Sequence, residues 1–392
     1  MKSQVQGMTS GSTKTRQGKP PADLIEVGKE LPFDVFANNG FLLMKKGYYV
    51  LTDEQKSKLE TLGFTPRKAE EREEPAEVDF EIEDKRLQPG PFDEMAHLYL
   101  RTRALLRQAF KIRGFQQSVE GVAQSILRLS EEQPDAVIAS ILLAPFREYA
   151  PAHAVHTTAL LALLTRRMAL PANHRETLLC AALTMNISQV ELQNELFSQQ
   201  DALTPDQKHE IKAHPLMSSA ILREVGVQDE LWHTLVQTHH ESWTGRGYPF
   251  ALQKTEILPP AHILHLADIV CAKLTPRRYR SALLPATALG QIFQKKDAEF
   301  DEAFTTLLIK ELGIYPPGSF VRLASNEIGV VTYRGAKPST PQVAALRKAD
   351  GPAYGEPLIR ETRNPSYQVV EPCAASLSGV RPGYLGNLWK TG

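Results

Sequence analysis

Apolar side chains recur every three or four residues over a long central stretch of the chain, from about residue 92 to residue 315. The segments HAVHTTALLALLTRRMAL, which starts at His153, and HILHLADIVCAKL, which starts at His262, show the pattern. This spacing gathers apolar side chains on one face of an α-helix. The pattern predicts a mainly α-helical domain over residues 92–315.

Shorter patterns flank the helical region on both sides. Between residues 23 and 66, two alternating apolar runs surround Asn38-Asn39-Gly40, a hairpin signal, and a polar helix is predicted from Thr52 to Gly63. Alternation returns in GSFVRLASNEIGVVTYR, which starts at Gly318. We therefore expect a small α+β module at 23–66 and a β-rich extension at 316–372. Composition predicts a disordered tail at 1–22, a charged linker at 67–91 and a second tail at 373–392.

Composition narrows the class of protein. The chain has 392 residues, 42% of them hydrophobic and 23% charged, which is typical of a soluble globular protein. Lys+Arg and Asp+Glu balance at 45 each, so no net charge favours nucleic acid or an anionic membrane as a partner. The three cysteines are too few and too scattered for a disulfide framework. Without a bilayer-length apolar run or a secretory h-region, the expected location is the cytoplasm.

The histidines of the helical region carry the candidate chemistry. In THHESWTGRGYP, the adjacent His239 and His240 precede a glycine-rich turn. Neighbouring helical side chains point about 100° apart, so both can serve one metal ion only near a helix end. In HILHLAD, His262, His265 and Asp268 lie along one helical stripe. Spacing alone leaves two alternatives open, a metal site and a buried, hydrogen-bonded histidine cluster.

Taken together, these motifs resemble the HD-GYP family of bacterial phosphodiesterases, which hydrolyse cyclic di-GMP. The resemblance runs from about residue 150 to residue 315, and both flanking modules resemble those of many members. It implies a helical bundle core of the HD type. The motifs that carry it are HAVHTTALLALL, LTPDQKHEIKAHP, THHESWTGRGYP, ILPPAHILHLADIV and RRYRSALLPATAL.

The resemblance implies that five of the family's metal ligands are present, whereas the His-Asp pair that names the family is replaced. Where members have AALLHDIGK, this chain has AALTMNISQ. Met185 takes the place of the histidine, Asn186 that of the bridging aspartate, and Gln189 that of the lysine that meets the substrate phosphate. The retained ligands are His153, His214, His239, His240 and Asp268.

These replacements change what the site can bind. A bridging carboxylate offsets the repulsion between two cations, whereas the Asn186 amide is neutral and has one acceptor oxygen. The Met185 thioether is a soft donor, poorly matched to Fe, Mn or Zn among nitrogen and oxygen ligands. The first cation's site keeps only His153 and Asp268. The second cation's site keeps three imidazoles, those of His214, His239 and His240. We therefore expect at most one divalent transition metal (Fe, Mn or Zn) and no dinuclear centre.

The resemblance also implies ligand and partner contacts. Arg280 matches a position that approaches the phosphate of cyclic di-GMP, and Arg277 lies beside it. The loop residues Gly245, Gly247, Tyr248 and Pro249 match a family loop implicated in contacts with diguanylate-cyclase (GGDEF) domains. The need for a tight turn explains the two glycines equally well.

Two functions compete on this basis. In the first, a catalytically impaired member of the family signals by binding cyclic di-GMP or a diguanylate-cyclase partner. In the second, the chain is an active metal-dependent phosphodiesterase with a rewired, histidine-rich metal site. His265 or His156 would then supply the missing imidazole. Glu191 and Glu195 are weaker candidates for the missing acid, because a solvated helix face accounts for acidic side chains at these positions.

Overall fold

The computed structural model describes residues 17–18, 22–27, 29, 31–36, 42–46, 50, 53–63, 65–66, 90–275, 284–295 and 299–390. The chain divides into two compact units, Met1–Pro75 and Ala76–Gly392. The expected turn at Asn38-Asn39-Gly40, the cap at Thr52, and all of the expected linker except residues 90 and 91 fall outside the described residues. The domain boundaries given above stay predictions.

The N-terminal unit is small and mixed. Strands β2 (Val35–Phe36) and β3 (Leu42–Met44) pair antiparallel, and helix α1 (Asp53–Leu62) follows. Strand β1 (Gln17–Gly18) pairs with β4 (Thr65–Pro66), although the sequence predicted a disordered tail at residues 1–22. A short 3-10 helix, η1, spans Ala22–Leu24. The apolar core of this unit consists of Ile25, Leu31, Val35, Val50 and Leu59.

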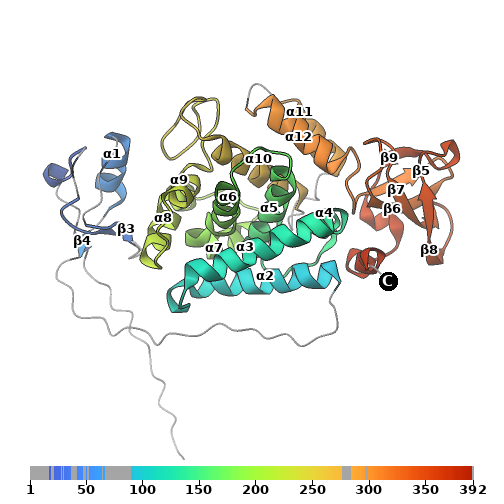
Figure 1. Ribbon diagram of the computed structural model, residues 1–392, viewed down its shortest axis with the longest axis horizontal. Helices are drawn as coiled ribbons and strands as arrows, with labels where there is room; N and C mark the ends of the chain where they lie inside the picture. The colour runs from blue at the N-terminus through green and yellow to red at the C-terminus, as the bar shows by residue number, and fades with distance from the viewer. Residues whose placement is uncertain are drawn as a thin grey trace, which may run out of the picture. The chain divides into compact units, whose positions relative to one another are not determined.

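The second unit begins with a run of helices (Figure 1). The mainly helical fold predicted from the sequence is confirmed. The helices are α2 (Pro91–Gln108), α3 (Phe115–Glu132), α4 (Pro134–Leu143), α5 (Tyr149–Thr165), α6 (Ala172–Thr184), α7 (Val190–Ser198), α8 (Pro205–Glu224), α9 (Glu230–Thr238), α10 (Pro259–Leu274), α11 (Pro285–Phe293) and α12 (Glu302–Leu312).

Helix α5 lies at the centre of this bundle. Every one of its residues is buried, which is why its sequence is apolar or small nearly all round instead of on one stripe. It packs against α2, α3, α6 and α10. Two other helices of the bundle start at well-formed caps: Thr204 accepts from the Gln207 amide at the start of α8, and Asp229 accepts from the amides of Leu231 and Trp232 at the start of α9.

An antiparallel sheet follows the helices, in the strand order β8-β7-β6-β5-β9. Asn326, with φ +59°, makes the turn between the first two strands. This sheet confirms the expected C-terminal β structure. The strands are β5 (Phe320–Leu323), β6 (Glu327–Tyr333), β7 (Gln342–Lys348), β8 (Ala353–Glu361) and β9 (Val369–Pro372).

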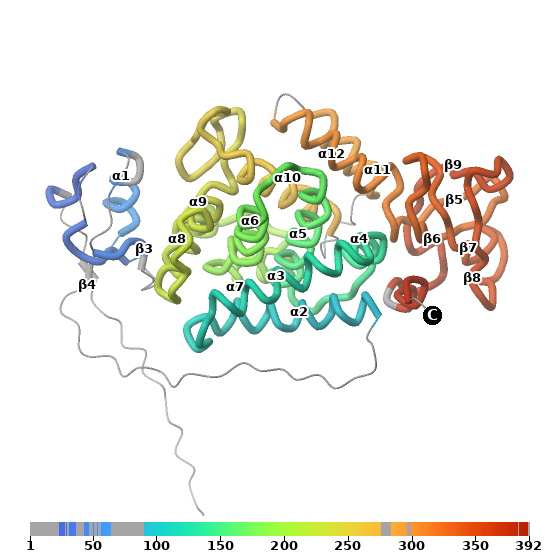
Figure 2. Tube along the Cα trace, viewed as in Figure 1, coloured from blue at the N-terminus to red at the C-terminus, as the bar shows by residue number. Residues whose placement is uncertain are grey.

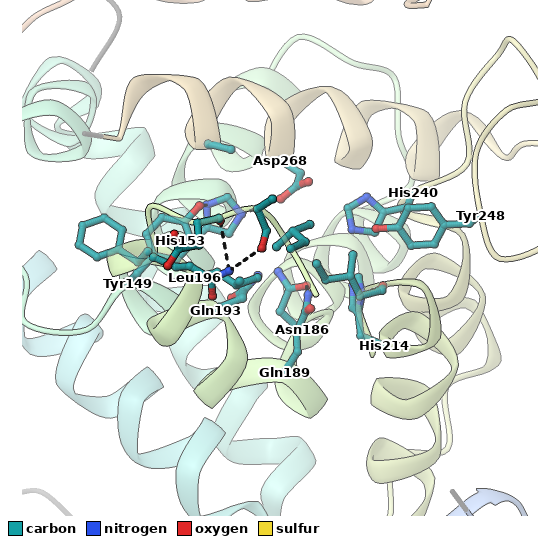
Figure 3. Close-up of a pocket in the computed structure, with 17 residues that line it drawn as sticks. Tyr149, His153, Asn186, Gln189, Gln193, Leu196, His214, His240, Tyr248 and Asp268 are labelled. Atoms are coloured by element: carbon teal, nitrogen blue, oxygen red, sulfur yellow. Dashed lines mark hydrogen bonds and ion pairs between the residues drawn. The ribbon is translucent and has the colours of Figure 1, made fainter. Parts of the chain in front are cut away.

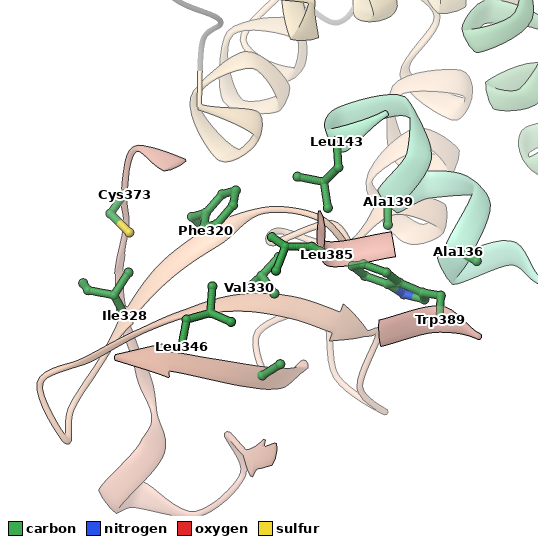
Figure 4. Packing of buried hydrophobic residues seen from close by; sticks show 11 residues of the cluster. Ala136, Ala139, Leu143, Phe320, Ile328, Val330, Leu346, Cys373, Leu385 and Trp389 are labelled. Atoms are coloured by element: carbon green, nitrogen blue, oxygen red, sulfur yellow. The ribbon is translucent and has the colours of Figure 1, made fainter. Parts of the chain in front are cut away.

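The segment after β9 differs from the expected tail at 373–392. It forms the 3-10 helices η5 (Ala375–Ser378) and η6 (Pro382–Trp389), and the trace returns to lie against α4 (Figure 2). Leu385 and Trp389 enter a core shared by α4 and the sheet (Figure 4). The frequent Pro and Gly of this segment suggested loose structure. Burial of the Trp389 indole stabilises the ordered segment by more than the low helix propensity of Pro and Gly destabilises it.

Among the described helices, none combines the length and the apolar character needed to cross a bilayer.

Candidate metal centre and its cavity

Three imidazoles meet where α8 and the end of α9 come together. His214 belongs to α8, while His239 is the C-cap residue directly after α9 and His240 follows it. One ring nitrogen from each lies within 4.8 Å of the other two. Helix α9 ends where the sequence analysis required an end, so both adjacent side chains reach one point.

Backbone carbonyls fix the tautomers of two of these rings. The Nδ1 of His214 lies 2.6 Å from the Ile211 carbonyl oxygen, and the Nδ1 of His239 lies 2.7 Å from that of Val236. Since a carbonyl oxygen only accepts, each Nδ1 carries the proton and each Nε2 keeps a lone pair. The two Nε2 atoms nevertheless lie 3.1 Å apart. Two lone pairs converging in this way suit a shared cation.

The carbonyl that His214 uses is free for a reason visible in the sequence. In the KAHP motif, Pro215 lies inside α8 and has no amide hydrogen to donate to Ile211, four residues earlier. The His214 imidazole donates to that carbonyl instead. The Val236 carbonyl likewise has no amide of the same helix to accept from, because α9 ends two residues after it.

Burial keeps these imidazoles neutral. It lowers the pKa of His239 to about 4 and the pKa of His214 and His240 well below the ordinary value. Neighbouring imidazoles add to the effect for His214 and His240. A neutral imidazole is the form that donates a lone pair to a metal, so the donor set fits one divalent transition metal ion.

The remnants of the other site contact each other directly. The Nε2 of His153, on α5, lies 2.6 Å from Oδ1 of Asp268, on α10. Nδ1 of His153 lies 3.3 Å from the Tyr149 hydroxyl. Although burial alone would raise it, the pKa of Asp268 is lowered by the hydrogen bond from His153. These two candidate ligands therefore form a buried hydrogen-bonded pair.

The replaced motif lies at the end of α6. Met185 is fully buried in the apolar core. Asn186 and Gln189 are buried as well, and the Gln189 Nε2 donates to the Asn186 Oδ1 at 2.8 Å. The acceptor oxygen of Asn186 is therefore engaged by Gln189.

A cavity of about 440 Å³ opens beside these groups (Figure 3). His153 and Asp268 line one part, His214, His240 and Tyr248 another, and Asn186 and Gln189 lie between them. Tyr149 and Phe197, whose rings stack at 5.2 Å, add aromatic surface. Among the described lining residues none is Lys or Arg. Arg277 and Arg280 fall outside the described residues.

A buried carboxylate holds the loop after the histidine pair. Glu241, 1% exposed, accepts from the amides of Phe250 at 2.6 Å and Leu252 at 2.9 Å. Tyr248 then stacks on His240 with ring centroids 4.6 Å apart. Sequence analysis did not single out Glu241, although its place directly after the two histidines was a usable signal.

Backbone conformation and packing within this loop favour glycine at two positions. Gly245 has a φ of +68°, a backbone conformation that residues with a side chain rarely adopt. A Cβ on Gly247 would lie 2.5 Å from the Glu241 Cα, so the loop folds back on its own backbone there. Pro249 is buried, whereas Thr244 and Arg246 are exposed. Chain packing alone thus accounts for both glycines.

The other candidates lie apart from the three imidazoles. His265 donates from Nδ1 to the His239 carbonyl at 2.8 Å, and its ring centroid lies 6.3 Å from that of His240. His156 lines a different cavity. Glu191 is 74% exposed and pairs with Arg107, and Glu195 accepts from Gln207.

The chain is similar to known proteins over the region that contains these residues. Residues 135–304 match the family model of the HD domain. A cyclic di-GMP phosphodiesterase of Pseudomonas aeruginosa is 27% identical over 232 residues, 59% of this chain and 55% of the relative. A cyclic di-GMP phosphodiesterase of Borreliella burgdorferi is 25% identical over 198 residues, 50% of this chain and 52% of the relative. The match thus spans about half the length of these relatives.

Among solved structures, an HD-GYP protein of Bdellovibrio bacteriovorus aligns with a TM-score of 0.48 at 12% identity, covering 73% of this chain and 96% of that one. The family-model match and the curated relatives identify the class. The chain contains an HD domain over residues 135–304, and its similarity to cyclic di-GMP phosphodiesterases supports a place in the HD-GYP family.

Proposed function

We propose that this chain is a signalling protein of the HD-GYP family that binds cyclic di-GMP, or a diguanylate-cyclase partner, without hydrolysing the nucleotide. Similarity to cyclic di-GMP phosphodiesterases supports the ligand class. The residues of the site support the absence of hydrolysis.

The contact between Asn186 and Gln189 carries the proposal. Hydrolysis by two cations needs a negative bridging oxygen between them to hold a shared, activated water. Here the residue at that position is a neutral amide whose oxygen accepts from Gln189 at 2.8 Å. His153 and Asp268, which would complete the first cation's site, are engaged with each other. Both observations favour one bound metal ion over two.

The three-histidine cluster is the proposed site of that single ion. His214, His239 and His240 would hold it through their neutral nitrogens and leave a coordination position open toward the cavity. A divalent cation bound there supplies Lewis-acid attraction for a phosphate oxygen. The residues themselves orient the ligand and exclude water.

Binding of cyclic di-GMP would combine stacking with charge. Tyr149 and Phe197 offer planar surfaces for a guanine base, and the cavity has room for part of the nucleotide. The described lining has no Lys or Arg, so the proposal assigns the positive charge for the phosphates to the metal ion and, as the family resemblance implies, to Arg277 and Arg280.

The loop with Gly245, Gly247, Tyr248 and Pro249 is the proposed contact for a diguanylate-cyclase domain. Glu241 anchors it, so the exposed Thr244 and Arg246 are presented from a fixed backbone. A preorganised loop loses little entropy on binding a partner.

A hydrolysis assay separates the competing functions. We expect wild-type protein to convert no measurable cyclic di-GMP to the linear dinucleotide or GMP, because the bridging carboxylate is absent. The combined variant Met185→His/Asn186→Asp/Gln189→Lys restores the family motif, and we expect turnover from it at least 100-fold above wild type. Equal activity in both proteins would instead establish the rewired phosphodiesterase.

Calorimetric titration of metal-loaded wild-type protein with cyclic di-GMP tests the ligand. We expect saturable binding that Arg280→Ala weakens about tenfold or more, since one bidentate phosphate contact is lost. The matched control is Arg246→Ala, an exposed arginine on the partner loop. A flat trace for wild type would contradict nucleotide binding.

A further inference from the structure

The end of α7 and its connection to α8 form one wall of the cavity beside the three histidines. Tyr149 and Leu196 lie on the side of the cavity opposite to His240 and Tyr248 (Figure 3). A nucleotide whose phosphate binds at the histidines would therefore meet this wall with its base or sugar. Six lining residues come from this short stretch of chain: Leu196, Phe197, Gln199, Asp201, Ala202 and Leu203.

Stacked aromatic rings reach this wall. The Tyr149 ring stacks with both His153 and Phe197, at centroid distances of 5.2 Å and interplanar angles of 18° and 17°. Phe197 belongs to the wall and lines the cavity. A planar base is the part of a nucleotide that stacks on such rings, and every base has a π-face that can do so. The rings therefore favour a base at this wall without selecting which base.

Amide side chains fix the backbone of the wall. The Gln199 Nε2 donates to the carbonyl oxygens of Asp201 at 3.3 Å and Ala202 at 3.4 Å. Gln207 on α8 holds Gln199 in turn, since its Nε2 donates to the Gln199 Oε1 at 2.8 Å. The backbone amide of Gln207 also donates to Thr204 at the cap of α8. Asp201 is thus carried on a backbone tied to a helix, which reduces the entropy lost on binding a ligand.

The wall also carries a free carboxylate. Two acids line the cavity, and Asp268 accepts from His153 at 2.6 Å. Asp201 is exposed, and its carboxylate has no hydrogen-bond or ion-pair partner among the described residues. A free carboxylate repels a dianionic nucleotide unless it accepts hydrogen bonds from it. Together with the stacked rings, it favours a planar base with hydrogen-bond donors along its edge.

We propose that Asp201 selects guanine, by accepting hydrogen bonds from the N1–H and the 2-amino group of a guanine that stacks at Phe197. Guanine is the base with two adjacent donors on its edge, and the two oxygens of one carboxylate accept both. Adenine has an acceptor at N1 beside its amino group, and this lone pair would face the carboxylate. Asp201 is thus a specificity-determining residue, an inference that rests on the proposed function because it concerns the same cavity.

Ligands of equal charge isolate the selection of the base. Cyclic di-AMP carries the same two phosphates as cyclic di-GMP, and cyclic di-IMP differs from cyclic di-GMP only in lacking the 2-amino groups. Calorimetric titration measures the affinity of each for the metal-loaded, full-length protein. The test variant is Asp201→Asn, which keeps the size of the side chain but offers one acceptor and one donor group. The control is Asp206→Asn, at an exposed acid of α8 outside the lining described for the cavity.

We expect wild type and Asp206→Asn to prefer cyclic di-GMP about tenfold or more over both other ligands, because each of these lacks a donor that the carboxylate requires. In Asp201→Asn, the preference over cyclic di-AMP should fall at least tenfold, since an amide can pair with the edge of adenine.

An unchanged preference in Asp201→Asn would overturn the selection of guanine by this residue and leave nucleotide binding in place. Equal affinities of wild type for all three ligands would do the same, and this comparison needs no variant. A flat trace of wild type with every ligand would instead contradict the proposed function, and this inference with it.

Discussion

At the scale of single residues, Pro215 fixes the orientation of a candidate metal ligand, the preceding His214. It removes the amide that would bond to the Ile211 carbonyl, and the His214 Nδ1–H takes that carbonyl at 2.6 Å. The bond directs the His214 Nε2 lone pair toward His239 and His240. A helix-breaking residue thus lies inside a 20-residue helix, and its missing donor leaves free the carbonyl that orients the neighbouring ring.

Replacing Pro215 with alanine tests this coupling. The new amide competes for the Ile211 carbonyl, so His214 loses its fixed tautomer and orientation. We expect Pro215→Ala to weaken binding of one Zn²⁺ or Mn²⁺ about tenfold, within the range for lost partners of metal ligands. Helicity should be kept, since alanine favours a helix over proline.

Competition with a chelating indicator measures this affinity, and elemental analysis measures stoichiometry. The control is Pro205→Ala at the first position of the same helix, where proline costs nothing. We expect no more than one transition metal per chain in wild type. Equal affinities in the two variants would contradict the role given to Pro215.

The sequence predicted the residues of this site better than their contacts. The replacements at Met185, Asn186 and Gln189 are visible by motif, because the flanking residues fix the register. That Gln189 donates to Asn186, and that His153 pairs with Asp268 115 residues away, depends on side-chain positions in three dimensions. Spacing along one chain contains no such information.

At the scale of elements, helices with a periodic apolar pattern were predictable, and irregular elements were not. Residues 373–390 fold as short 3-10 helices, which have no apolar period that a pattern search detects. Their order comes from Trp389, whose Nε1 donates to the Thr332 carbonyl at 2.8 Å. Tertiary packing decides the structure of such a segment.

One buried carboxylate links strands β6 and β8 of the C-terminal sheet. Glu327, at the start of β6, is 3% exposed and accepts from Arg360 and Tyr354 on β8 and from Ser325. The hydrogen bond from Arg360 is the largest cause that lowers the pKa of Glu327 to about 2, against the opposing effect of burial. The ionised carboxylate therefore stabilises the folded sheet.

This lowered pKa predicts acid sensitivity with a definite sign. The folded pKa of about 2 lies below the value of 4.5 for an unperturbed carboxyl, so the stabilisation is complete above pH 4.5. It is lost as pH falls from about 4.5 toward 2, and amounts to about 3 kcal/mol.

Urea unfolding between pH 3 and 7, followed by far-UV circular dichroism, measures the free energy of unfolding. Glu327→Gln should remove this part of the pH dependence and destabilise the protein at pH 7. Glu361→Gln, an exposed position on β8, is the control. The same acid slope in Glu327→Gln and wild type would contradict this role.

At the scale of the whole described second unit, helices and sheet share one apolar core. Ala136, Ala139 and Leu143 of α4 pack with Phe320 and other residues of the sheet (Figure 4). Polar contacts reinforce the junction, since Arg334 pairs with Asp135 at 2.5 Å. Such a core couples the stability of the two layers.

Trp389→Ala tests that coupling across the unit. Removing an indole that is 1% exposed leaves a cavity between α4 and the sheet and should cost about 3–5 kcal/mol. Because the core is shared, hydrogen exchange of α5 and β6 amides should accelerate by the same factor under conditions of global unfolding. Tyr384→Ala removes a ring that is 70% exposed on the same 3-10 helix. It should leave the free energy of unfolding and the exchange rates of α5 and β6 unchanged. Faster exchange in β6 alone would mean that the sheet unfolds independently of the helices.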